Sequence, residues 1–260
     1  MSEARQPNPA ITAAAQAIRA SQRLVVLSGA GISKESGIPT FRDAMHGLWS
    51  RYDPMQLATP RAFRRNPRLV WDWYQYRRGL LAEAVPNPGH YAIAQLEDLL
   101  PHVVVITQNI DGFHQQAGST DVIPVHGDIR RNKCFDNCQG NPTYVNIDEL
   151  VEWDQSAGPP RCPHCGAYVR PDVVWFEETL PADAIARAFD LCETADVLLV
   201  VGTSGVVQPV AHLPFVAAQN GAQVIEVNPE QTPISRVVRW HLAGPSGEIL
   251  PQVIAEMCHA

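Results

Sequence analysis

A buried strand that runs directly into a glycine turn is the feature that most constrains how this chain folds. Val25, Val26 and Leu27 form a short, largely β-branched apolar run, which is typical of a strand covered on both faces. Gly29 and Gly31 follow at once, and glycine lets the backbone turn sharply and lets a ligand approach the main chain. A strand, a glycine turn and a helix start are the parts of a dinucleotide pyrophosphate site.

The dinucleotide fingerprint G-x-G-x-x-G is incomplete in this turn. Lys34 stands where the third glycine is expected, and Ser33 is placed to cap the next helix. So short a motif also occurs by chance, so these residues alone support a tight structural turn as well as they support a nucleotide site.

Three further apolar runs end in polar or glycine residues. They are 103–106, 197–201 and 224–227, and helical spacing covers 9–21, 61–100 and 182–195. This βαβ rhythm predicts an α/β fold with a doubly wound, Rossmann-like parallel sheet. Because ligands bind outside the carboxyl ends of such strands, polar side chains after each run are candidates for a site.

Composition narrows the class of protein. The chain has 260 residues, which fits one large domain, or a large one with a small insert. A net charge of -7 does not favour nucleic acid, and no apolar run reaches a membrane-spanning length. The first residues lack the apolar core of a signal peptide, so we expect a reducing, cytoplasmic location.

Four of the six cysteines form two close pairs. Cys134 and Cys138 are followed, after 23 residues, by Cys162 and Cys165. Paired knuckles of this kind predict a tetrahedral four-thiolate zinc site, which is structural because no coordination position stays open. With zinc bound, residues 130–170 would be a zinc module inserted in the larger fold. Four free thiols are the alternative.

Two polar patterns have both a plain and a functional interpretation. Tyr74 and Arg77 share a helix face, and a phenol beside a guanidinium can bind a carboxylate. Spacing alone favours an aromatic core with a solvated arginine. His126 follows an apolar run, and a lone histidine is more often structural, although its pKa suits a general base.

The continuation of the glycine turn resembles the sirtuin family of NAD-dependent protein-lysine deacylases. That signature is G-A-G-I-S followed by G-I-P-x-F-R, and all of it is present from Gly29 to Arg42. The segment T-Q-N-I-D-G at 107–112 and the H-G at 126–127 also match the family. At 170–178 the chain resembles R-P-x-V-V-x-F-G-E, except that Glu177 stands where the family usually has glycine.

The resemblance implies a function and a set of residues for it. Sirtuins transfer an acyl group from lysine to the ADP-ribose of NAD, releasing nicotinamide, and His126 matches their general base. Phe41 would shield the reactive face. The implied NAD-contacting residues are Gly29, Ala30, Gly31, Ile32, Phe41, Arg42, Gln108, Asn109, Ile110, Asp111, Gly202, Thr203, Ser204, Asn228, Pro229, Glu230 and Ser246.

The family resemblance also gives a substrate preference. Tyr74 and Arg77 match the Tyr-x-x-Arg pair of sirtuins that remove succinyl and malonyl groups, and Ala58 would leave room in the acyl pocket. The segment Val174, Trp175 and Phe176 would pair with an extended substrate peptide by β-augmentation. A plain core strand is the alternative for that segment.

The expected organisation is a single catalytic domain spanning the chain. Residues 20–129 and 171–255 would form the NAD-binding part, and 130–170 the zinc module. Acylated-lysine proteins are the expected partners, without nucleic acid or membrane, and we expect a monomer. The alternatives are a protein ADP-ribosyltransferase that uses the same NAD pocket and a non-catalytic NAD sensor. A hydride-transferring dehydrogenase fits less well, because it needs no closed zinc site.

Overall fold

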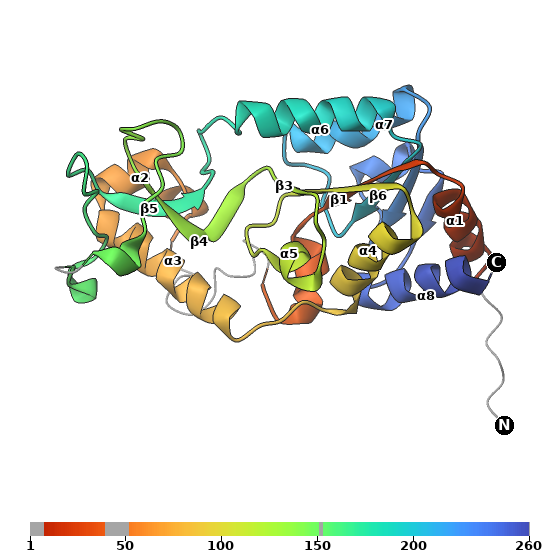
Figure 1. Cartoon of the computed structure of the whole chain (residues 1–260), viewed down its shortest axis with the longest axis horizontal. Helices are drawn as coiled ribbons and strands as arrows, with labels where there is room; N and C mark the ends of the chain where they lie inside the picture. Colours follow the sequence, from red (N-terminus) through yellow and green to blue (C-terminus); the bar gives the residue numbers. More distant parts are fainter. Residues whose placement is uncertain (1–7, 40–51, 151–152, 260) are drawn as a thin grey trace.

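The structure, a computed structural model, describes residues 8–39, 52–150 and 153–259. Figure 1 shows how the elements are arranged along the chain. The α-helices and strands are α1 (Pro9–Arg19), β1 (Arg23–Ser28), α2 (Pro60–Arg65), α3 (Pro67–Ala82), α4 (Pro88–Leu99), β2 (His102–Thr107), α5 (Phe113–Ala117), β3 (Val122–Pro124), β4 (Gly127–Cys134), β5 (Val169–Val173), α6 (Ala182–Thr194), β6 (Val197–Val201), α7 (Leu213–Gln219), β7 (Gln223–Val227), β8 (Trp240–Leu242) and α8 (Ser246–His259). Short 3-10 helices are η1 (Ala30–Ser36), η3 (Pro54–Gln56), η4 (Ile147–Glu149), η5 (Gln155–Ala157), η6 (Val210–His212) and η7 (Pro233–Arg236).

Six parallel strands form the main sheet, in the order β3-β2-β1-β6-β7-β8. The chain builds outward from β1 in one direction, then returns through β6 and builds outward in the other. The strand order therefore reverses between β1 and β6, and this reversal is the place where an open α/β sheet binds ligands.

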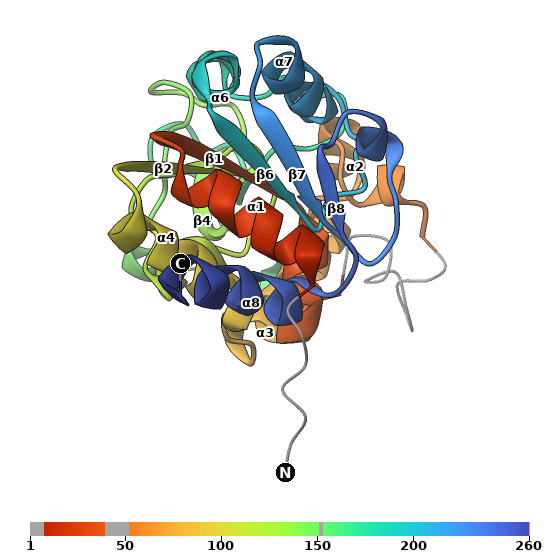
Figure 2. The same ribbon diagram turned by 90° about the vertical axis from the view of Figure 1, so that its right-hand side faces the viewer.

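Helices cover both faces of this sheet, as Figure 2 shows. Leu24 and Val26 of β1 pack in the core beneath α1, α4 and α8. Val25 and Leu27 point to the opposite face, where α6 and α7 cover them. Because successive strand residues point to opposite faces, two buried faces require the continuous apolar run that the sequence shows. The predicted doubly wound, Rossmann-like parallel sheet is confirmed.

A smaller lobe forms beside the sheet, on the left in Figure 1. Its two strands, β4 and β5, pair antiparallel, with a register irregularity between Asp128 and Asn132. Helices α2 and α3 pack on these strands through a core of their own, which includes Phe63, Trp73 and Trp175. The smaller lobe therefore includes α2 and α3, which precede the predicted zinc module in sequence. The boundaries of that module, 130–170, stay a prediction.

Asn66 sets the sharp junction between α2 and α3. It ends α2, and its side chain accepts a hydrogen bond from the Leu69 amide as the N-cap of α3. Pro67 follows at the first helical position, where its missing N–H leaves no donor unsatisfied. The junction fixes the direction of α3, which carries Tyr74 and Arg77.

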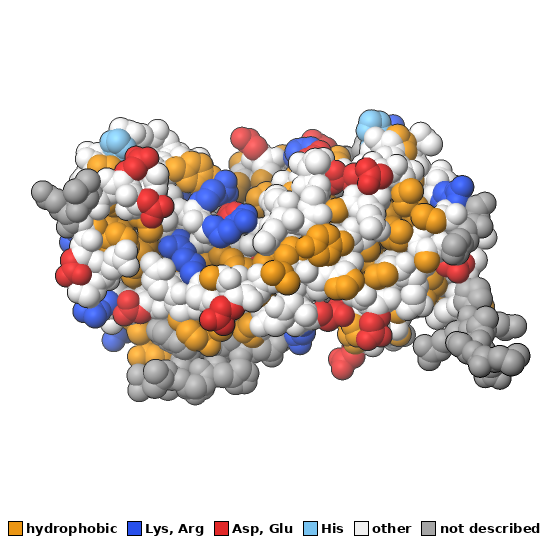
Figure 3. All heavy atoms as spheres, turned by 60° about the horizontal axis from the view of Figure 1, so that its bottom comes forward, with side chains coloured by type: hydrophobic (Ala, Val, Ile, Leu, Met, Phe, Trp, Pro, Cys, Tyr) orange, Lys and Arg blue, Asp and Glu red, His pale blue; other side chains and the backbone are white. Residues whose placement is uncertain are grey.

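The surface carries both signs of charge in Figure 3. A groove of about 410 Å³ on the smaller lobe is lined by Arg78, Arg130 and Arg131 among others. Arg130 pairs with Asp128 and Arg131 with Asp172, so this basic groove is largely neutralised. Among the described helices, none has the length and apolar character needed to cross a membrane.

Candidate active site

The candidate site lies at the carboxyl edge of the sheet, where β1 and β6 end side by side. The loop after β1 continues into η1, and the loop after β6 begins at Gly202. Backbone bonds join the two loops, because the Gly29 amide donates to the Val201 carbonyl and the Gly31 amide to the Gly202 carbonyl. The two segments that sequence marks as nucleotide-binding therefore form one floor.

The glycines of this floor are required for loop packing. A Cβ on Gly31 would lie 2.5 Å from the Gly202 carbonyl oxygen, and one on Gly29 would lie 2.8 Å from Thr203. Real Cβ atoms do not approach backbone so closely. The adjacent loop therefore fills the space where each Cβ would stand. The predicted contacts of Gly29 and Gly31 with NAD stay predictions.

Asn109, Asp111 and Ser33 form a buried polar cluster beside this floor. The Asn109 amide donates to the Gly29 carbonyl at 3.2 Å and to the Ser33 hydroxyl at 3.1 Å. The Ser33 hydroxyl in turn donates to Asp111 at 2.7 Å. Both donors of the Asn109 amide are therefore used, which leaves its carbonyl oxygen as the acceptor it can offer to a ligand. Ser33 is thus an anchor of the cluster; the expected role as a helix cap is wrong, because Gly29 occupies that position.

A second set of polar contacts joins the loops after β2, β6 and β7. Gln108 donates to the Thr203 hydroxyl at 2.9 Å, and Asn228 donates to the Thr203 carbonyl at 2.9 Å. Thr203 is buried, whereas Ser204, Pro229 and Glu230 are exposed at the rim. These amides and hydroxyls lie in the crevice where a dinucleotide's ribose and phosphate oxygens need partners, so the residues present fit NAD.

His126 lies directly before β4 and borders the same crevice. Its Nδ1 is 2.9 Å from the Gln108 carbonyl oxygen, which can only accept, so Nδ1 carries the proton. Nε2 of the neutral ring is then a lone pair that can take a proton. Burial lowers the pKa of His126 below its ordinary 6.5, against an opposing effect of the Gln108 bond. The ring is therefore neutral at pH 7, as a general base must be.

Asp111 carries a raised pKa, chiefly because burial disfavours its charged form. Hydrogen bonds from the Phe113 amide and the Ser33 hydroxyl partly offset that effect. Its carboxylate is held by both donors within the cluster. The side chain is thus placed rigidly at the crevice, next to the end of α3.

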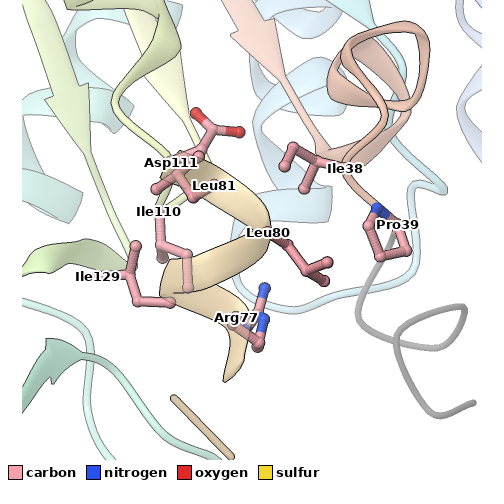
Figure 4. Close-up of a pocket in the computed structure, with 8 residues that line it drawn as sticks. All are labelled: Ile38, Pro39, Arg77, Leu80, Leu81, Ile110, Asp111 and Ile129. Atoms are coloured by element: carbon pink, nitrogen blue, oxygen red, sulfur yellow. The ribbon is translucent and has the colours of Figure 1, made fainter. Parts of the chain in front are cut away.

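Tyr74 and Arg77 lie on the same face of α3, as predicted. The Arg77 guanidinium is 5.9 Å from the centre of the Tyr74 ring. Burial lowers the pKa of Arg77, with Tyr74 and Asp111 acting in the opposite direction. A cavity of about 20 Å³, shown in Figure 4, has both Arg77 and Asp111 in its wall. Arg77 therefore faces the site and is not the fully solvated arginine that spacing alone favours.

The segment after β5 is buried in the core of the smaller lobe at Trp175 and reaches the surface at Phe176. Trp175 is buried, and its indole N–H donates to the Tyr74 hydroxyl oxygen at 2.9 Å. The Phe176 amide donates to the Ala58 carbonyl at 3.0 Å, which ties this segment to the chain before α2. Ala58 is buried in the same core and does not line the cavity beside Arg77. Phe176 itself is exposed.

The four paired cysteines converge at one point of the smaller lobe. Their sulfur atoms all lie within 4.8 Å of one another. Cys134 and Cys165 are 3.6 Å apart, and Cys138 and Cys162 are 3.8 Å apart. Tetrahedral Zn–S bonds place sulfurs about 3.8 Å from one another. The cluster fits a structural zinc ion with no open position, and the predicted ligand set comes together as expected.

Comparison with known proteins identifies the family. Residues 29–209 match the Sir2 family. This chain belongs to that family, the sirtuins. An NAD-dependent protein deacylase of Aquifex aeolicus (strain VF5) is 54% identical over 218 residues, which cover 84% of this chain and 88% of that protein. NAD-dependent protein deacylase 1 of Pseudomonas aeruginosa PAO1 is 45% identical over 242 residues, or 93% and 97% of the two chains.

Solved sirtuin structures share the whole fold. A Sir2 homologue in complex with NAD superposes with a TM-score of 0.84 at 40% identity, covering 95% of this chain and 93% of that one. Sir2Af2 bound to a myristoylated histone peptide gives a TM-score of 0.76 at 35% identity, covering 96% and 97%. The resemblance drawn from the motifs is therefore confirmed.

Several predicted site residues of this sirtuin stand apart from the polar cluster. The Ile32 side chain is fully buried in the core, so only its backbone can serve a ligand, while Ala30 is exposed. Ser246 begins α8, and its hydroxyl donates to Glu35 at 3.0 Å. Ile110 lines the cavity beside Arg77. The predicted contacts of these residues with NAD stay predictions, and Phe41 and Arg42 lie outside the described residues.

Sequence reasoning missed two residues that hold the nucleotide loop. Asn87, the N-cap of α4, donates to the Ile32 carbonyl at 2.6 Å and to the Ser36 hydroxyl at 3.0 Å. Glu35 accepts from Ser246 and from the Gly247 amide, and so links η1 to α8. Asn87 before Pro88 is a local signal for a helix start. Nothing local signals the contacts of either residue with the loop, because these partners lie 51 to 212 positions away.

Proposed function

We propose that this sirtuin is an NAD-dependent protein-lysine deacylase that prefers acyl groups ending in a carboxylate, succinyl and malonyl, over acetyl. The observation that carries the proposal is the position of Arg77. Arg77 borders the same small cavity as Asp111. The residue that would recognise the acyl group therefore lies beside the crevice that would hold NAD. The curated relatives are named NAD-dependent protein deacylases, which supports the reaction class.

The chain's own residues supply binding, orientation and one proton acceptor. NAD, when bound, supplies the ADP-ribosyl group that receives the acyl group, with nicotinamide as the leaving group. Asn109 and Asp111 hold the ribose side of the crevice, fixed by Ser33 and the Gly29 carbonyl. His126 takes up a proton at Nε2, because Nδ1 is committed to the Gln108 carbonyl.

Electrostatics explains why a carboxylate is favoured beside α3. Burial disfavours the charged form of Arg77, and a bound carboxylate offsets that cost by pairing with the guanidinium. Burial also raises the pKa of Tyr74, so the phenol keeps its proton and remains a donor at neutral pH. An acetyl group offers neither residue an anionic partner.

An extended peptide would reach this pocket along the segment after β5. The side chain of Phe176 is exposed on this segment and offers an apolar contact to a bound peptide. Sir2Af2 has been solved with a myristoylated histone peptide, which supports acylated-lysine protein as the substrate class. We further propose that the enzyme works as a cytoplasmic monomer.

Substitution of Arg77 tests the acyl preference. Arg77→Met removes the cation while keeping a long side chain, and its kcat/KM for succinyl-lysine peptide should fall roughly 10- to 100-fold, the value of a hydrogen bond to a charged group. Activity on the same peptide carrying acetyl-lysine should be largely retained. Mass spectrometry of acetyl-, succinyl- and malonyl-lysine peptides, with and without NAD, measures both.

Arg68→Met is the matched control, because Arg68 lies on the exposed side of the same helix. It should alter neither activity. Equal loss on both acyl groups in Arg77→Met would remove the selectivity role and leave the deacylase. Transfer of radiolabelled ADP-ribose to protein, without deacylation, would favour the transferase instead.

A further inference from the structure

Trp175 is buried beside Tyr74 of α3, although it belongs to the segment that follows β5. Its side chain is 2% exposed and packs beside Phe63 and Tyr74 in the core of the smaller lobe. The indole N–H donates to the Tyr74 oxygen at 2.9 Å across 101 residues of sequence. This bond therefore depends on the tertiary fold, and it connects the segment after β5 with α3.

The direction of this hydrogen bond follows from the two chemical groups. An indole nitrogen can only donate, so the Tyr74 oxygen must accept. The phenol then has its single O–H proton left to donate to another group. Among the described residues the Tyr74 hydroxyl has Trp175 as its one hydrogen-bond partner. The proton thus remains for another acceptor, and the Arg77 guanidinium, 5.9 Å from the Tyr74 ring centre, is the neighbouring cation on the same helix face.

We propose that Trp175 is a positioning residue for acyl specificity, which orients the Tyr74 hydroxyl as a donor to the carboxylate of the acyl group. The inference rests on the proposed function and adds a residue to it. Accepting from the indole also polarises the phenol, which strengthens its own donation. Without Trp175 the hydroxyl would be free to rotate, and its proton would no longer be directed at the ligand.

The Arg170–Glu178 ion pair holds Trp175 in place. The Arg170 guanidinium lies 3.2 Å from the centre of the Trp175 ring. Arg170 is paired with Glu178 at 2.6 Å, and Glu178 also accepts the Trp175 backbone amide at 2.8 Å. Ring and backbone are thus fixed by the same ion pair. A rigid donor loses little entropy when it orients another group, which suits a positioning role.

Trp175→Phe tests the proposal, because phenylalanine keeps an aromatic ring over Arg170 and deletes the N–H. The ratio of kcat/KM for succinyl-lysine to acetyl-lysine peptide should fall roughly fivefold, the worth of one net hydrogen bond. The loss should lie in KM for the succinyl peptide, since the bond orients a binding group. In a Tyr74→Phe background the same substitution should have no further effect on the ratio.

Trp153→Phe is the matched control. It also deletes an indole N–H in the smaller lobe, but one that donates to the Gly158 carbonyl, so its ratio should match that of the wild type. Equal loss on both peptides in Trp175→Phe, or independent effects of Trp175 and Tyr74 in the double variant, would overturn the proposal. A wild-type enzyme without succinyl preference would overturn the proposed preference first, and this inference with it.

An NMR measurement on Trp175 tests the hydrogen bond without replacing the tryptophan, so it does not depend on the folding of Trp175→Phe. The indole 1H–15N resonance of Trp175 should shift when Tyr74 is changed to Phe, and again when succinyl-lysine peptide is added to the wild type. Acetyl-lysine peptide should shift it less. A resonance that is indifferent to Tyr74→Phe would refute the hydrogen bond on which the inference depends.

Discussion

At the scale of single residues, hydrogen-bond partners determine which chemistry each side chain can perform. His126 becomes a proton acceptor because the Gln108 carbonyl fixes the proton on Nδ1. Asn109 becomes an acceptor because Gly29 and Ser33 use both its N–H donors. Neither property follows from residue type, since a neutral histidine has two tautomers and an amide offers both donors and an acceptor.

The pH dependence of catalysis follows from the His126 ring. Burial lowers the pKa of His126, so the neutral base is fully present at pH 7 and is lost as the pH falls through a value below 6.5. We expect kcat/KM for acetyl-lysine peptide to decline on the acid side with that midpoint. His126→Tyr should lower turnover roughly 100- to 10,000-fold with NAD binding retained. A midpoint above 6.5, or retained turnover, would contradict the assignment.

Glu177 adopts a backbone conformation that favours glycine. Its φ is 71°, in the left-handed region that side chains disfavour. We expect Glu177→Gly to be more stable than Glu177→Ala by roughly 1 kcal/mol, because only alanine retains the strain. Both variants lack the carboxylate and hence the exposed ion pair with Arg61, so the difference isolates the backbone. Urea denaturation measures it, and equal stabilities would show that the backbone shifts to relieve the strain.

At the scale of elements, β4 and β5 hold together parts of the site that lie far apart in sequence. β4 begins immediately after His126, and the His126 carbonyl accepts the Val174 amide at 2.9 Å just beyond β5. At the other end of the pair, Cys134 closes β4 beside the sulfur cluster. His126 and Val174 are thus tied to a strand pair whose other end carries Cys134, one of the four clustered cysteines.

Loss of one sulfur ligand should weaken the strand pair. Cys138→Ser leaves three thiolates, so we expect purified protein with most of its zinc lost and a lower Tm, because the metal stabilises only the folded lobe. Cys258→Ser is the control, since Cys258 is exposed and outside the cluster. Metal analysis and thermal unfolding test this. One zinc per chain in Cys138→Ser, at unchanged Tm, would show that the cluster does not need its fourth thiolate.

At the scale of the whole molecule, two buried histidines join the layer of helices to the sheet near the nucleotide loop. His90 of α4 and His114 of α5 lie with ring centres 5.2 Å apart. His90 accepts the Asn87 amide, and His114 contacts the Ser28 hydroxyl at 2.8 Å. Among the described residues, His90 Nε2 and His114 Nδ1 meet no hydrogen-bond partner. Both rings are therefore packed to remain neutral.

These histidines should make the fold sensitive to acid. Burial lowers the pKa of His90 to about 4 and that of His114 to about 3. The unfolded chain binds these protons near pH 6.5, so stability is full above that value and is lost as the pH falls toward 4. The shift of His90 alone corresponds to a loss on the order of 3 kcal/mol.

Denaturant unfolding between pH 7 and pH 4 measures this loss of stability. His90→Gln should flatten the profile, because glutamine does not titrate and keeps a side-chain acceptor toward Asn87. The exposed His102 provides the control, and His102→Gln should leave the slope unchanged. An equally steep profile in His90→Gln would place the acid sensitivity elsewhere.

Sequence by itself was sufficient for the fold class, the four cysteine ligands and the family. Continuous apolar runs are needed only where both faces of a sheet are covered, and paired cysteines at short spacing serve few other purposes. The strands around Val25, Val103 and Val197 thus follow from local pattern. Tyr74 and Arg77 also share a face, because three-residue spacing in a helix leaves no other arrangement.

Only the tertiary structure decided how these residues work together. Ser33 holds Asp111 by a hydrogen bond instead of capping a helix. Gly29 and Gly31 leave the space that the neighbouring loop after β6 occupies. The bond from Trp175 to Tyr74 spans 101 residues. Such contacts depend on the packing of one element against another, which the spacing of residues along the chain does not predict. The strand pattern specifies the sheet, but packing decides which donors and acceptors remain for a ligand.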